Sequence, residues 1–414
     1  MSIIKNSLWN VVGYIVPAIV TIPALGILGR ILGAETFGVF TLALAIVGYA
    51  SIFDVGLSRA VIREIALFRD DQEEKRRIIF TASLLVTVMG VTAALVLYIA
   101  SDVIANLLKI SSELHLSVVN SLHILSLSIP VYLVTQIWLA ILEGEEKFGL
   151  LNIYKSITGS LISLLPVICI FISPSIEYAI IGLVVSRLVC MLFAFFLCKR
   201  IIVESYFEFS KLTLKRMLMF GGWITVSNII SPLMAYFDRF IVSNQLGAAV
   251  VAFYTAPSEI IARLGIVPGA FARAIFPRLS CSNDVHDRKK NKKIVSLLLF
   301  LITVPVFIVG LLASNKFMVL WMGPEFAGTS ANILVILLLG FVFNSLAQVP
   351  FASIQSRGYA KITAYIHMVE LIPYLMALFY FINNYGIIGA AYAWSIRVTI
   401  DYILLAFFDR CFDK

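Results

Sequence analysis

The chain has 414 residues, of which 60% are hydrophobic and 14% charged, and its mean hydropathy is +0.97. Soluble domains contain about 45–50% apolar and about 25% charged residues, so this composition excludes an ordinary water-soluble domain. The formal net charge of +8 does not indicate nucleic acid as a partner, because the basic residues follow a membrane topology.

Apolar stretches long enough to cross a bilayer follow one another along the whole chain. A membrane-spanning helix needs about 20 mostly apolar residues, whereas a barrel strand needs only about ten residues of alternating polarity. We therefore predict an all-α, polytopic membrane protein with about 12 transmembrane helices. The predicted spans are residues 8–31, 36–57, 78–100, 118–142, 151–172, 177–198, 217–245, 250–271, 294–314, 327–352, 362–382 and 386–408.

Lysine and arginine gather on alternate loops between these spans. Segment 58–77 contains six of them, segment 199–216 five and segment 272–293 seven. The loop 101–117 contains Lys109 alone, and the loop 315–326 contains Lys316 alone. Because cytoplasmic loops collect basic residues, we predict that both termini lie in the cytoplasm. Anionic membrane lipids are expected contacts of these basic loops.

The two halves of the chain resemble each other when one is shifted along the other. A shift of about 214 residues aligns "LGA" at 32–34 with "LGA" at 246–248, and a shift of about 207 aligns "YAIIG" at 178–182 with "YGIIG" at 385–389. We predict two six-helix lobes related by an internal repeat, residues 1–204 and 205–414. Parallel repeats of this kind place a transport site between the lobes.

Several charged residues fall inside the predicted spans, where each costs about 2.5–3.5 kcal/mol if it faces lipid. Glu259 and Arg263 stand four positions apart, as do Arg397 and Asp401, so each couple can pair on one helix face. Asp238 and Arg239 are adjacent and point about 100° apart, so each needs a separate partner or solvent. Structural pairing and a water-filled cavity both remain open for these charges.

Two sequence patterns resemble a known family. The segment 29–66 contains Leu32-Gly33, Phe37-Gly38 and then Asp54, Gly56, Leu57 and Arg59, and the second half contains "YFDRFIVSNQLG" at 236–247 followed by "FYTAP". These motifs resemble the O-antigen and related polysaccharide-export flippases of the multidrug/oligosaccharidyl-lipid/polysaccharide exporter superfamily. The resemblance implies a transporter in the bacterial inner membrane. It would flip a polyprenyl-diphosphate-linked oligosaccharide from the cytoplasmic to the periplasmic leaflet for O-antigen or other surface polysaccharide.

A diphosphate substrate would need a cationic cavity, because arginine stays charged and grips phosphate oxygens with paired hydrogen bonds. We predict Arg30, Arg239 and Arg263 as cavity residues. Arg59, Arg63 and Arg273 lie near the cytoplasmic ends of spans and are predicted to receive the diphosphate. The alternative role of these last three is to anchor the topology.

Buried carboxylates can couple transport to protons or sodium ions. We predict Asp54, Asp238, Glu259 and, as a weaker candidate, Glu370 as coupling residues. No cofactor, metal site or catalytic residue is predicted, and the acids of the turn 142–149 are expected to be solvated.

Three other functions remain open. A drug or cation antiporter of the same superfamily would need acids to dominate the cavity, yet arginine is as prominent as acid in the spans. A membrane glycan polymerase would need a large outer loop, and the predicted outer loops are short, so we expect a protein that is not an enzyme. A scaffold of a polysaccharide assembly complex is the third. A flippase could also contact the polymerase and chain-length proteins of its pathway.

Overall fold

The computed structural model describes residues 3–54, 56–205, 208–281 and 285–412. Within these ranges the chain is helical and contains no β-strand, which confirms the predicted all-α class. The helices are α1 (Ile3–Tyr49), α2 (Leu57–Leu67), α3 (Gln72–Leu107), α4 (Ser112–Ser126), α5 (Ser128–Gly144), α6 (Phe148–Ile170), α7 (Ile176–Glu204), α8 (Lys211–Leu246), α9 (Ala248–Leu264), α10 (Ile266–Cys281), α11 (Val285–Met322), α12 (Thr329–Ser356), α13 (Ala360–Tyr385) and α14 (Ile387–Phe412). The described residues also form two short 3-10 helices, η1 (Ala50–Asp54) and η2 (Pro324–Phe326).

Each predicted span coincides with helical structure. Ten helices of the described residues are long and apolar enough to cross a membrane. One of them, Val16–Asp54, contains the first predicted span in part and the second almost entirely. The predicted span 217–245 coincides with α8, in which the side chains of 220–233 and 235 lie outside the described residues. These helices confirm a polytopic membrane protein.

The repeated "LGA" sequence adopts the same backbone conformation in both halves. Gly33 has φ 73° and ψ 170° and bends α1 between the first two predicted spans. Gly247 has φ 92° and ψ 158° and separates α8 from α9. Side chains disfavour these positive φ values strongly. The glycine of each repeat therefore allows a sharp turn between two consecutive membrane helices.

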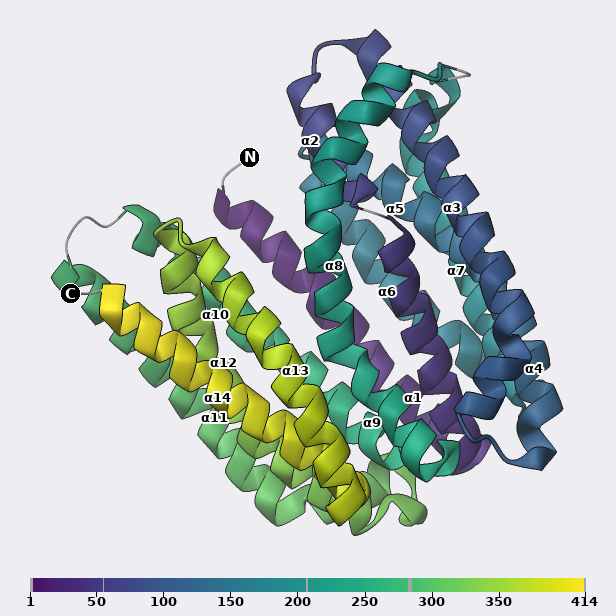
Figure 1. Cartoon of the computed structure of the whole chain (residues 1–414), viewed down its shortest axis with the longest axis vertical. Helices are drawn as coiled ribbons and strands as arrows, with labels where there is room; N and C mark the ends of the chain where they lie inside the picture. The colour runs from purple at the N-terminus through teal and green to yellow at the C-terminus, as the bar shows by residue number, and fades with distance from the viewer. Residues whose placement is uncertain (1–2, 55, 206–207, 282–284, 413–414) are drawn as a thin grey trace. The chain divides into compact units, whose positions relative to one another are not determined.

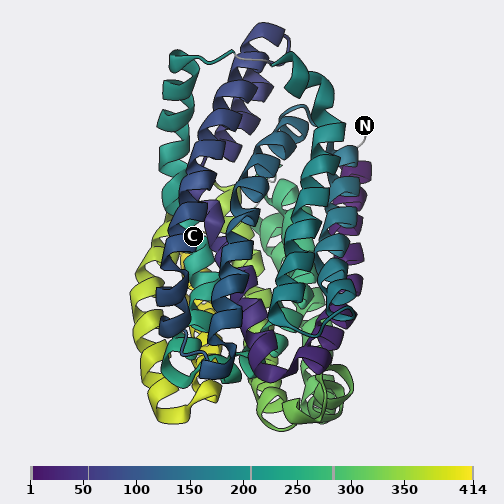
Figure 2. The same cartoon turned by 90° about the vertical axis from the view of Figure 1, so that its right-hand side faces the viewer.

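The chain divides into two compact units, Met1–Phe237 and Asp238–Lys414. In the first unit α7 packs on α4, α5 and α6, and α3 packs on α4 and α5. In the second unit α14 packs on α12 and α13, and α11 packs on α12. The helices of each unit lie side by side as a bundle (Figures 1 and 2). In each unit the last helix therefore lies against the helices just before it, while the predicted lobes 1–204 and 205–414 stay a prediction.

The outward side of α11 shows why these bundles belong in a membrane. Ile294, Leu297, Leu301, Val309 and Leu312 are all exposed on this helix. Soluble monomers rarely expose so long an apolar stripe. Lipid chains are the environment in which such a surface is stable.

Candidate functional site

The adjacent charges Asp238 and Arg239 lie near the end of α8, and both are buried. The carboxylate of Asp238 accepts hydrogen bonds from the Tyr254 hydroxyl of α9 and from the backbone N–H of Arg239. The guanidinium of Arg239 turns elsewhere, to Glu259. This confirms that the two side chains need separate partners, as their angular separation on the helix requires.

Arg239 of α8 and Arg263 of α9 both pair with the carboxylate of Glu259 on α9. Arg239 donates to Glu259 Oε1 over 2.8 Å, and Arg263, one turn after Glu259, donates to Glu259 Oε2. Arg239 is 5% exposed, whereas the side chain of Arg263 is 25% exposed. The three-residue group carries one excess positive charge, and Arg263 is the member that solvent or a ligand can reach.

A second group of titratable residues lies between α13 and α14. Glu370 is 7% exposed, and neither of its carboxylate oxygens has a hydrogen-bond partner. Asp401 lies 3.5 Å from His367 Nε2, and Arg397 lies over the ring of Tyr374 at 5.2 Å. Of the two roles left open for Arg397 and Asp401, an ion pair between them is absent among the described contacts, and Asp401 lies beside the histidine of the neighbouring helix instead.

The predicted residues of the first unit surround the short helix α2. Both oxygens of Asp54 accept from the backbone N–H of Ser58, and Oδ1 also accepts from its hydroxyl. Asp54 therefore caps the beginning of α2. Arg59 and Arg63 lie on the exposed side of this helix, opposite Leu57, Val61 and Ile65. Helices with such faces lie in the plane of a membrane surface.

Arg59 and Arg63 each have an acidic neighbour. Arg59 lies 3.8 Å from Glu143, and Arg63 lies 3.0 Å from Glu64. Arg30 on α1 and Arg273 on α10 are exposed. A cavity that unites these arginines with those of α8 and α9 stays a prediction.

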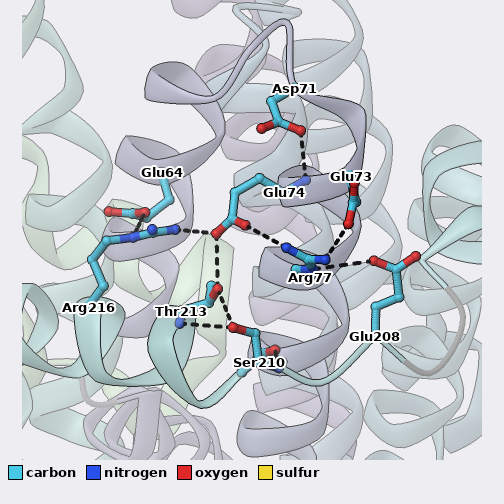
Figure 3. Close-up of polar contacts among 10 residues, drawn as sticks. Glu64, Asp71, Glu73, Glu74, Arg77, Glu208, Ser210, Thr213 and Arg216 are labelled. Carbon is cyan, nitrogen blue, oxygen red and sulfur yellow. Dashed lines mark hydrogen bonds and ion pairs between the residues drawn. The ribbon is translucent and has the colours of Figure 1, made fainter.

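A charged network joins α2, α3 and the beginning of α8 (Figure 3). The carboxylate of Glu64, with no exposed surface, pairs with Arg216. The other side of the same guanidinium donates to Glu74 Oε1 over 2.6 Å. Thr213 also donates to Glu74 Oε1, over 3.0 Å. Arg216 thus holds α8 against both α2 and α3.

The same network fixes the segment that leads into α8 (Figure 3). Ser210 accepts from the backbone N–H of Thr213 at 3.2 Å and so caps the helix. Its own N–H donates to Thr81 of α3 over 3.1 Å. Arg77 lies 3.7 Å from Glu74 and 3.8 Å from Glu208.

The turn after α5 contains a largely buried ion pair. Glu145 lies 3.2 Å from Lys75, whose side chain is 6% exposed, and 2.6 Å from Lys147. Burial by itself raises the pKa of Glu145, but the hydrogen bonds from Lys147 and Lys75 and their positive charges outweigh it and lower the pKa. The expectation that the acids of this turn are solvated is wrong for Glu145.

The sequence did not reveal the roles of Glu64, Glu74 and Arg216. The basic content of 58–77 and 199–216 indicated only which side of the membrane these segments occupy. A repeat of charges such as Glu73, Glu74 and Arg77 marks a helix surface, but it contains no information on a partner 142 residues away.

Among the residues that the structure describes, no group of three or more His, Cys, Asp or Glu residues could hold a metal ion.

Comparison with known proteins places the chain among polysaccharide biosynthesis proteins. Residues 3–283 match the family described as "Polysaccharide biosynthesis protein". A Shigella flexneri protein whose name assigns it to O-antigen transport is 49% identical over 98% of this chain and 97% of its own length. The lipopolysaccharide biosynthesis protein WzxC of Escherichia coli is 20% identical over 97% of this chain and 78% of its own length.

Solved structures show the same fold at low sequence identity. The lipid II flippase MurJ in an inward closed conformation matches with a TM-score of 0.81 and 17% identity, over 97% of this chain and 87% of MurJ. An inward-facing multidrug resistance transporter of the MATE family, in the MOP superfamily, matches with a TM-score of 0.78 and 18% identity, over 98% of both chains. These matches confirm the predicted fold class, a polytopic bundle of membrane helices.

Proposed function

This chain belongs to the polysaccharide biosynthesis protein family, and we propose that it is a flippase for a lipid-linked oligosaccharide. In this proposal a polyprenyl-diphosphate-linked repeat unit crosses from the cytoplasmic to the periplasmic leaflet and then serves O-antigen or surface polysaccharide synthesis. The 49% identity to the Shigella protein, over nearly the full length of both chains, supports this substrate class. The Shigella relative is named for transport, in line with a protein that is not itself an enzyme.

The charge of the α8–α9 group favours an anionic substrate over a cationic drug. A site for cations needs excess carboxylate, but here the two acids Asp238 and Glu259 are matched by Arg239 and Arg263. A diphosphate could take the reachable guanidinium of Arg263 while Arg239 remains paired with Glu259. The greater exposure of Arg263, 25% against 13% for the Glu259 side chain and 5% for Asp238, is the observation on which the choice of an anionic substrate depends.

The other arginines have separate parts in the proposal. Arg30 joins Arg239 and Arg263 as a cavity residue. Arg59, Arg63 and Arg273 are exposed and receive the diphosphate from the cytoplasmic leaflet. Arg239 is buried and paired with Glu259, so in the proposal it contributes positive charge to the cavity, while the exposed arginines contact the diphosphate directly.

Coupling to a proton or sodium gradient is proposed to involve Glu370 foremost among the predicted acids. Asp54 is engaged by Ser58, Asp238 by Tyr254 and Glu259 by two arginines. Glu370 is buried without a hydrogen bond, so binding of a proton or a cation would relieve the cost of burying its charge.

The proposed location is the bacterial inner membrane, with both termini in the cytoplasm. The positive-inside distribution of Lys and Arg supports this orientation. A polymerase and a chain-length protein that use the flipped unit are the proposed partners on the periplasmic side.

The test measures surface polysaccharide and lipid-linked repeat units in a host from which the gene has been deleted. Wild type, Arg263→Ala and the charge-retaining control Arg263→Lys are expressed at equal membrane levels. We expect Arg263→Ala to lose surface polymer and to accumulate repeat units on the cytoplasmic face. Arg263→Lys should keep part of the activity, because a lysine still attracts phosphate without the paired hydrogen bonds.

Two results would contradict the proposal. Surface polysaccharide that is unchanged in the deletion host would remove the flippase function and favour the drug antiporter. Normal transport by Arg263→Ala would leave the flippase function intact and move the anion site away from α9.

A further inference from the structure

A basic cavity lies in the second unit, where the beginning of α11 meets the end of α14 and the last turns of α12. Its volume is about 380 Å³, which is within the usual range for small-molecule sites. Leu346, Val349 and Pro350 of α12 and Ala406 of α14 form its apolar wall. The sequence predicts that this end of the helices lies on the cytoplasmic side, because the lysines of the cavity belong to the basic segment 272–293.

The polar side of the cavity carries four cationic side chains and one carboxylate. The cations are Lys289, Lys292, Lys293 and Arg410, and the carboxylate is Asp409. Lys292 is 9% exposed and lies 2.7 Å from Asp409, which Arg357 also approaches at 3.9 Å. Asp409 is therefore already neutralised inside the protein. The positive charges of Lys289, Lys293 and Arg410 face the solvent side, where all three are exposed.

The cavity opens beside a surface made for lipid chains. Lys289 and Lys293 stand one turn apart on α11, and Leu297 and Leu301 continue along the helix at the same spacing. Both leucines are exposed, as is Ile294 beside Lys293. A molecule with a phosphate at the two lysines would place attached acyl chains along this apolar stripe.

We propose that this cavity is a binding site for the headgroup of an anionic phospholipid, with its phosphate at Lys289, Lys293 and Arg410 and its acyl chains along α11. Phosphate is the group that clustered Lys and Arg recognise, and basic pockets between membrane helices on the cytoplasmic side bind anionic lipid headgroups. The buried Lys292–Asp409 pair holds α11 and α14 together at the base of the site. This lipid site does not depend on what the protein transports.

Binding is measured on the full-length, delipidated protein in detergent, by native mass spectrometry during titration with phosphatidylglycerol or with neutral phosphatidylcholine. The test variant is the triple substitution K289Q/K293Q/R410Q, which spares the buried pair. The control variant is K211Q/K290Q/K361Q, which removes three exposed basic residues outside the cavity. Both variants lose the same charge on the same predicted side of the membrane.

We expect wild type and the control variant to prefer phosphatidylglycerol over phosphatidylcholine. The test variant should bind phosphatidylglycerol on the order of a hundredfold more weakly, because each basic residue near an anionic lipid contributes to its attraction. Equal binding by wild type and the test variant would overturn the proposal. An equal loss in both variants would also overturn it, because diffuse surface charge would then explain the affinity.

Inorganic phosphate distinguishes a lipid from a free phosphate as the ligand. Titrated to about 10 mM, ten times a dissociation constant of 1 mM that corresponds to about −4.1 kcal/mol, it should leave phosphatidylglycerol bound, since the acyl chains contribute apolar contacts that a free ion lacks. Complete displacement of the lipid by phosphate would show a site for a soluble anion and overturn the lipid assignment.

Discussion

The guanidinium of Arg216 on α8 donates to the carboxylate of Glu74 on α3 over 2.6 Å, although 142 positions separate the two residues. The same guanidinium pairs with Glu64 of α2, a carboxylate with no exposed surface. Removal of one partner from a buried pair leaves an uncompensated charge, and such losses are typically 3–5 kcal/mol. This attachment of α8 to α2 and α3 should therefore be a major source of local stability.

Arg216→Ala should lower the free energy of unfolding by about 3 kcal/mol, because Glu64 would remain buried with Arg63 as its remaining partner. Thermal unfolding of the purified protein in detergent measures this. Arg200→Ala is the matched control, since the Arg200–Glu204 pair lies on the surface and should contribute less than about 1 kcal/mol. Equal effects of the two substitutions would show that the network in Figure 3 has no special weight.

Gly33→Ala and Gly247→Ala should each destabilise the protein by about 1–3 kcal/mol. Both glycines have positive φ with ψ near 160–170°, a region that is strained for any residue with a Cβ. Space is not the cause at Gly33, where a Cβ would meet nothing within 4 Å. Gly149→Ala is the control: it also has open space but lies in helix α6, so alanine there should be neutral or slightly stabilising. Unfolding temperatures of the three variants decide the matter.

The contribution of Glu145 to stability should depend on pH in the acid range. Its pKa is lower in the folded protein than its ordinary value of 4.5, so its ion pairs with Lys75 and Lys147 stabilise the fold fully above pH 4.5. That stabilisation disappears as pH falls through the lower, folded pKa. The difference in unfolding temperature between wild type and Glu145→Gln should thus be constant from about pH 5 to 7 and shrink below that range. A difference that grows on acidification would contradict this assignment.

Much of the fold follows from patterns that are local in sequence. Apolar runs of about 20 residues predict the spans, and the repeated "LGA" aligns the two halves at Gly33 and Gly247, where the structure shows equivalent turns. The Glu259–Arg263 pair could also be anticipated from the sequence, because its members stand four positions apart on one helix. Spacing failed for Arg397 and Asp401, since spacing permits a pair but cannot show that His367 from α13 lies closer. The Glu74–Arg216 contact has no local signal, because it forms only when α3 and α8 pack together.

Arg239→Ala should mainly lower the stability of the protein, whereas Arg263→Ala should mainly lower transport. Arg239 is buried against Glu259, so its loss should destabilise the protein by about 3 kcal/mol. Arg263→Ala leaves the Arg239–Glu259 pair in place and should change stability by less than about 1 kcal/mol. It should nevertheless reduce transport about tenfold or more, since a charge-assisted hydrogen bond to a substrate contributes about 1.5–3 kcal/mol. Unfolding and transport measured on the same preparations separate the two effects, and equal transport by wild type and Arg263→Ala would contradict the second.

Glu370→Gln should abolish the dependence of transport on an ion gradient and leave the fold intact. The buried carboxylate of Glu370 makes no hydrogen bond, so the amide removes a costly charge without breaking a contact. Asp54→Asn is the matched control, because Asp54 is also a buried acid but caps α2 through Ser58. We expect the control to keep the capping contact, since asparagine caps helices about as well as aspartate, and to keep its gradient dependence. Transport is measured in proteoliposomes with imposed proton or sodium gradients. If Glu370→Gln still responds to both gradients as wild type does, then Glu370 is not the coupling residue and its burial is purely structural.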